Sequence, residues 1–151
     1  MGTVPLKPVA GMPELTDISV LPIGALLDIK PVRGYSYRYT TGPFLLPQNA
    51  GSLDWGLLNN DTVQQTARVT VFKCPVGAVK TPAAPGALIV TLDPGKASHN
   101  ANKYSEGFFY EVVVESNSNL VFPYVSVWPA QLGVVLPGTG INSGNFIRLM
   151  P

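Results

Sequence analysis

Proline and glycine interrupt this chain too often for it to form long helices. Each contributes 15 of the 151 residues. Proline removes a backbone donor and glycine weakens the interior of helices and strands. Between these interruptions lie short runs in which apolar and polar side chains alternate, as in half-buried strands. A chain of this length holds one domain. We therefore expect an all-β fold, a single antiparallel β-sandwich of jelly-roll or immunoglobulin-like type with about eight strands.

The clearest strand patterns lie in the second half of the chain. The run 108–115 places Phe108, Tyr110, Val112 and Val114 on one face, which we expect to face the core. Residues 87–92 form a continuous apolar, β-branched run, which predicts a central strand with both faces covered. Residues 120–128 contain Pro123, which predicts an edge strand or a bulge. Further short strands are expected at residues 35–39, 44–46, 55–58, 67–72, 133–136 and 145–150.

The order of strands and turns in residues 67–72, 90–95 and 112–116 resembles that of many small bacterial immunoglobulin-like sandwiches. It is also similar to that of soluble transducer-type β-sandwich subunits. The resemblance spans residues 57–128 and contains no functional motif. It therefore implies a fold and no particular activity.

The first 32 residues differ in composition from the rest and predict an extended arm. They contain five prolines, whose spacing excludes a regular helix longer than two turns. They also carry too many apolar side chains for a solvated linker, so the arm needs a surface to cover. The residues expected to make this contact are Leu6, Val9, Leu15, Ile18, Val20 and Leu21. The sequence thus divides into an arm, residues 1–32, and a β-sandwich domain, residues 33–151.

The charge content of the chain is unusually low. Charged residues make up 13%, about half of what is typical, and the formal net charge is +1. Such a chain has no strong field to attract nucleic acid, and it has no apolar run long enough to span a membrane. The N-terminus lacks the pattern of a signal peptide. Because subunit interfaces are depleted in charge, burial between copies suits this surface, and we expect assembly at a cell surface or in a particle.

Residues that could carry catalysis or bind a metal are few and scattered. The single histidine, His99, lies in the polar segment 97–102, which we expect to be a loop. Glu111 and Glu115 share a strand face but lie about 13 Å apart along it, beyond the reach of a glycosidase pair, and are expected to be solvated. Cys74 has no cysteine or histidine partner at zinc-site spacing. We therefore expect no catalytic site, no metal and no cofactor.

Aromatic side chains are the remaining candidates for recognition. Tyr35, Tyr37 and Tyr39 alternate on one face of a predicted strand. This stripe could form a stacking surface for a sugar or a base, a subunit contact, or part of the core within the chain. Trp55 and Trp128 are the other possible stacking or interface residues.

Two functions fit these features. The first is a non-enzymatic, self-assembling subunit of a homo-oligomer, in a ring, shell or surface filament, whose arm adds a strand to a neighbour. The arm could instead fold back on its own domain as an extra edge strand. The second is a carbohydrate-type ligand-binding module that uses the aromatic residues for stacking.

Overall fold

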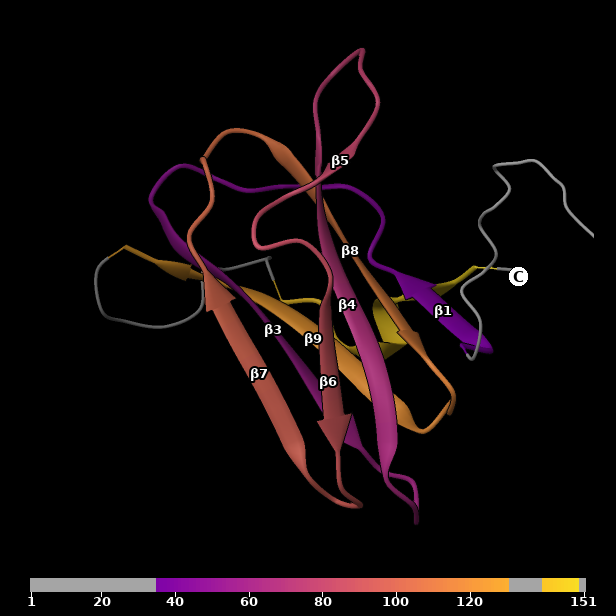
Figure 1. Cartoon of the computed structure of the whole chain (residues 1–151). Helices are drawn as coiled ribbons and strands as arrows, with labels where there is room; N and C mark the ends of the chain where they lie inside the picture. The colour runs from indigo at the N-terminus through magenta and orange to yellow at the C-terminus, as the bar shows by residue number, and fades with distance from the viewer. Residues whose placement is uncertain (1–34, 131–139, 150–151) are drawn as a thin grey trace, which may run out of the picture. The chain divides into compact units, whose positions relative to one another are not determined.

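The computed structural model describes residues 35–130 and 140–149, and this part of the chain is all-β apart from one short 3-10 helix (Figure 1). The all-β prediction is confirmed. The arm, residues 1–32, and the strand expected at residues 133–136 lie outside the described residues. The described strands are β1 (Tyr37–Thr40), β2 (Phe44–Leu45), β3 (Ala50–Asn59), β4 (Gln65–Cys74), β5 (Thr81–Pro82), β6 (Leu88–Leu92), β7 (Ala97–Asn102), β8 (Phe109–Ser116), β9 (Val121–Pro129) and β10 (Ile147–Arg148), and the helix η2 is Ser143–Asn145.

The strands form two antiparallel sheets. The larger sheet has the order β10-β1-β8-β4-β5, with β2 also paired to β8 and β6 also paired to β4. The smaller sheet has the order β7-β3-β9. In Figure 1, β3 and β9 of the smaller sheet run behind β4 and β6 of the larger one.

One hydrophobic core joins the two sheets. Period-two alternation turns every second side chain of the long strands towards it. Tyr110, Val112 and Val114 of β8 are buried there, which confirms the predicted core face of that strand. Phe108, which was expected on the same face, precedes the strand and is exposed, with Lys73 Nζ lying 3.8 Å from the centre of its ring. The smaller sheet contributes Leu53, Trp55, Leu57, Val121, Val125 and Val127, and β4 contributes Ala67, Val69 and Val71.

Strand β9 lies at the edge of the smaller sheet, as Pro123 predicts. It pairs with β3 over its whole length. Its other side meets a single residue in the described part of the chain: the backbones of Val125 and Ile141 exchange two hydrogen bonds of 2.8 Å. Because proline lacks a donor, it is tolerated at an edge where no further strand needs that hydrogen bond.

Two of the expected elements are wrong. Residues 87–92 do not form a central strand, because β6 pairs with β4 alone among the described strands and Ile89 is 61% exposed. Its burial alternates, since one face of an antiparallel sheet can remain solvated. Residues 97–102 are not a loop but the edge strand β7, paired with β3. An edge strand that is at most half-buried needs little apolar surface, so its polar composition resembles that of a loop.

The carboxylates of β8 are buried, not solvated as the sequence suggested. Glu115 receives hydrogen bonds of 2.8–3.2 Å from the Arg68 guanidinium, which is its register partner on β4. Glu111 accepts from Thr40 Oγ1 and from Lys80 Nζ, both at 2.7 Å. Strand β8 lies between β1 and β4, so polar side chains from its neighbours pair with both carboxylates and offset the cost of burying them.

Asn59 links the two sheets at one corner. Its side chain is fully buried, and its Nδ2 donates 2.9 Å hydrogen bonds to the carbonyls of Val63 and Leu92. Its Oδ1 accepts from the backbone N–H of Asp61 at 2.9 Å. Asn59 ends β3 of the smaller sheet and Leu92 ends β6 of the larger one. The amide therefore holds strand ends of both sheets together.

We predict that replacing Asn59 with leucine, which has a similar volume, lowers the free energy of unfolding by about 2–4 kcal/mol. The substitution leaves a backbone donor and two backbone carbonyls without the partner that this side chain supplies. Urea unfolding followed by circular dichroism measures the change. Asn117→Leu, the same substitution at an exposed site, should change the stability by less than about 0.5 kcal/mol. Equal effects at the two positions would contradict the role of Asn59.

Candidate functional site

The outer face of the smaller sheet carries an aromatic row. Because the odd-numbered valines of β9 face the core, Tyr124, Ser126 and Trp128 face away from it. Tyr124 is 45% exposed and Trp128 is 38% exposed. On the neighbouring strand β3, their register partners are Gly56, Asp54 and Ser52.

Tyr124 and Trp128 line an open groove with a volume of about 390 Å³. Its other wall is formed by residues 140–142, which are held beside β9 by the pairing of Ile141 with Val125. Sites for small molecules typically enclose about 300–1,000 Å³ and combine apolar walls with a few polar groups. The volume of this open groove lies within that range, and its walls are mainly apolar.

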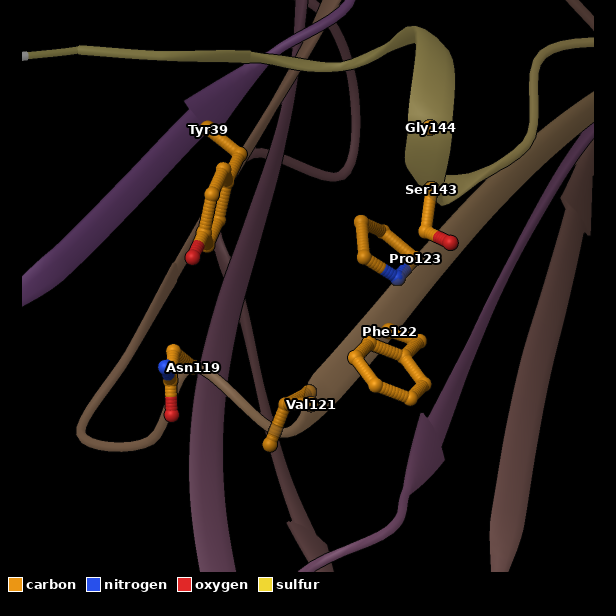
Figure 2. A pocket seen from close by; sticks show the side chains of 7 residues that line it. All are labelled: Tyr39, Asn119, Val121, Phe122, Pro123, Ser143 and Gly144. Carbon is orange, nitrogen blue, oxygen red and sulfur yellow. The ribbon is translucent and has the colours of Figure 1, made fainter.

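A second, smaller hollow of about 190 Å³ lies beside η2 (Figure 2). Tyr39 of β1 stands on one side of it, and Pro123 and Ser143 stand across from Tyr39. The remaining lining residues are Asn119, Val121, Phe122 and Gly144. Its volume is below the usual range for a ligand site, so it is the weaker candidate.

The predicted tyrosine stripe lies against other parts of the larger sheet. Tyr37 and Tyr39 pair in register with Ser116 and Val114 of β8, and both are half-buried. The Arg148 guanidinium lies 4.8 Å from the centre of the Tyr37 ring, a cation–π contact. Tyr35, just before β1, is also half-buried. The stripe thus makes contacts within the chain and does not present three open rings.

The two tryptophans have different environments. Trp55 is 3% exposed and belongs to the core, so it cannot offer a stacking face, and its inclusion among the candidate stacking residues is wrong. Trp128 does reach the surface. Tyr124 was missed in the sequence analysis, although its spacing of four residues from Trp128 on one strand places the two on the same face.

Groups capable of acid–base or metal chemistry are dispersed in the described part of the chain. His99 is exposed on β7, opposite Gly56. Burial and the negative charge of Glu111 raise the pKa of the Cys74 thiol, which disfavours the reactive thiolate. In residues 35–130 and 140–149, no three His, Cys, Asp or Glu side chains are grouped so that they could hold a metal ion.

Strands β6 and β7 each leave one edge without a partner among the described strands. Neither contains a lysine, arginine, aspartate, glutamate or proline. Exposed edges are commonly protected by charge, proline or a bulge, because their free backbone groups can pair with another strand. Neither of these two edges is protected by charge or by proline.

Comparisons with known proteins identify no family. No protein-family model matches the sequence, and no curated protein matches it. Among solved structures, the "Crystal Structure of Thermotoga maritima 1070" aligns with 76% of this chain and 91% of that one, at 11% sequence identity and a TM-score of 0.48. Within the described residues, no helix has the length and hydrophobicity needed to cross a bilayer.

We predict that the two tryptophans respond differently to a soluble quencher. In Trp55→Phe, the remaining Trp128 should emit at longer wavelength and be quenched strongly by acrylamide, because it is partly exposed. In Trp128→Phe, the buried Trp55 should emit at shorter wavelength and be quenched weakly. Steady-state fluorescence measures both. Similar quenching constants for the two variants would contradict the placement of these side chains.

Proposed function

We propose that this protein is a non-enzymatic structural subunit that assembles with copies of itself into a ring, shell or surface filament. The observation that supports this most directly is the pair of strand edges, β6 and β7, which carry no charge and no proline. In a protein selected to remain a monomer, such edges are usually protected. Here they remain open to pairing within the described part of the chain.

The N-terminal arm is the segment that we propose for this pairing. Its residues Ile18 and Val20 alternate around Ser19, so an extended arm presents both to one side, as a strand does. Strand β6 offers a free edge along its five residues, and its Ile89 side chain is exposed. A donated strand supplies main-chain hydrogen bonds, and its apolar side chains cover exposed surface.

The composition supports assembly as well. Charged residues make up 13% of the chain, and the centres of subunit interfaces are similarly poor in charge.

Two antiparallel sheets around one core support a β-sandwich, and we assign it to the jelly-roll or immunoglobulin-like type. If arms are donated head to tail, a rotation that closes gives a ring and one that does not gives a filament.

We predict that deleting residues 1–30 abolishes assembly and leaves the β-fold intact. Light scattering on the eluate of a sizing column, with negative-stain electron microscopy, measures assembly, and circular dichroism reports the fold. Removal of the arm takes away the donated strand, so the shortened chain should elute as a monomer. A full-length chain that is already monomeric would indicate that the arm folds back on its own domain. Assembly unchanged by the deletion would exclude the arm as the contact.

We predict that Ile89→Lys also weakens assembly. The protein concentration at which half of the chains are assembled should rise by tenfold or more. A lysine on β6 places charge where the incoming strand must pack. Val76→Lys makes a similar change at an exposed loop position and should leave assembly unchanged. Analytical ultracentrifugation of both variants measures the shift. If the two variants behave alike, β6 is not the acceptor.

A further inference from the structure

We propose that the groove along β9 binds a neutral polysaccharide, whose pyranose rings stack on Tyr124 and Trp128. This inference does not depend on self-assembly, because it rests on the outer face of the smaller sheet and not on the free edges of β6 and β7. The arrangement of aromatic and polar side chains on that face favours a sugar chain for four reasons.

First, the Tyr124 ring lies across the backbone of β3 at Gly56. A Cβ atom at Gly56 would come within 2.1–2.6 Å of the ring carbons and hydroxyl of Tyr124, so the ring occupies the space that a side chain there would fill. Gly56 is therefore needed for this position of the ring. With 45% of its surface exposed, Tyr124 offers an aromatic platform supported from below by backbone.

Second, polar groups lie between the two aromatic rings. Ser126 lies between Tyr124 and Trp128 on β9 but is buried, and its half-buried register partner on β3 is Asp54. Asp54 Oδ1 accepts a hydrogen bond from Ser52 Oγ at 2.6 Å. Asn142, on the opposite wall of the groove, uses its Oδ1 to cap η2, and its amide NH₂ has no protein partner in the described segments. A sugar hydroxyl in the groove can accept from this amide, and one that reaches across β9 to Asp54 on β3 can donate to its carboxylate.

Third, the spacing suits a chain and not a single sugar. Four residues of extended strand separate the two aromatic positions by about 13 Å. That distance is longer than one pyranose ring, so the two aromatic side chains would contact different units of the same chain. One face of a pyranose with equatorial hydroxyls exposes mainly C–H groups, which the negative face of an aromatic ring attracts.

Fourth, the described lining of the groove offers no cationic partner for an anionic ligand. No lysine or arginine is among its described lining residues, so phosphate or carboxylate groups would find no cationic partner there. A peptide strand would bind best at the edges of β6 and β7, where it could form main-chain hydrogen bonds. The groove along β9 instead offers contacts with side chains. The chemistry therefore favours a neutral, hydroxyl-rich ligand.

The test is native affinity electrophoresis of the full chain in gels containing hydroxyethylcellulose, xylan, glucomannan or dextran. We expect the wild type to be retarded by at least one of the β-1,4-linked polymers. Trp128→Ala and Tyr124→Ala should each weaken this retardation about tenfold or more, because each removes one of the two rings on which the sugar chain stacks. Gly56→Ala should weaken it too, although both aromatic residues remain, because the added Cβ displaces the Tyr124 ring.

Phe109→Ala is the matched control, since Phe109 is 40% exposed on the larger sheet, away from the groove, and its loss should leave retardation unchanged. Circular dichroism of each variant verifies folding. If Gly56→Ala or Tyr124→Ala does not fold, Tyr124→Phe provides the second test: it keeps the aromatic ring and should retain binding. Absence of retardation by all four polymers overturns the proposal. So does retardation that survives in both Trp128→Ala and Tyr124→Ala. A change in oligomeric mass in these two variants without any sugar binding would instead assign the face to a subunit contact.

Discussion

The buried amide of Asn59 is the interaction on which the arrangement of the two sheets depends most clearly. A sheet-on-sheet core is held by non-directional contacts, which do not by themselves fix where strand ends meet. Asn59 adds direction, because its side chain joins the end of β3 to the end of β6. Its backbone N–H also donates to the carbonyl of Lys96, just before β7. The hydrogen bond from Asn59 to the Leu92 carbonyl forms only when both sheets are in place, so it favours one register over its alternatives.

The two faces and the outer edge of strand β9 each have a different structural role. Val121, Val125 and Val127 complete the shared core, and Tyr124 and Trp128 form the exposed aromatic row. Its edge is paired at one point by Ile141, which brings residues 140–142 alongside and gives the groove its second wall. The groove is thus a consequence of a strand that is buried on one face and only partly paired at its edge.

Much of the fold follows from local pattern, and the failures have identifiable causes. The alternation in 108–115 is strong enough to assign Tyr110, Val112 and Val114 to the core correctly. The same pattern could not reveal that Glu111 and Glu115 are buried, because their partners Lys80 and Arg68 are 31 and 47 residues away. The edge positions of β6 and β7 were likewise unpredictable, since a strand's place in a sheet depends on pairings made elsewhere in the chain.

The sequence by itself determined the all-β class and the alternation of apolar and polar side chains along the strands, because proline, glycine and period-two patterns act over a few residues. The low charge follows directly from the composition. It also limited the recognition candidates to aromatic side chains. Only the tertiary structure decided which of them are available: Trp55 is enclosed by the core, Tyr37 is covered by Arg148, and Trp128 is joined by Tyr124 beside a groove. Exposure depends on which strands face each other, and that is settled by contacts between residues far apart in the chain.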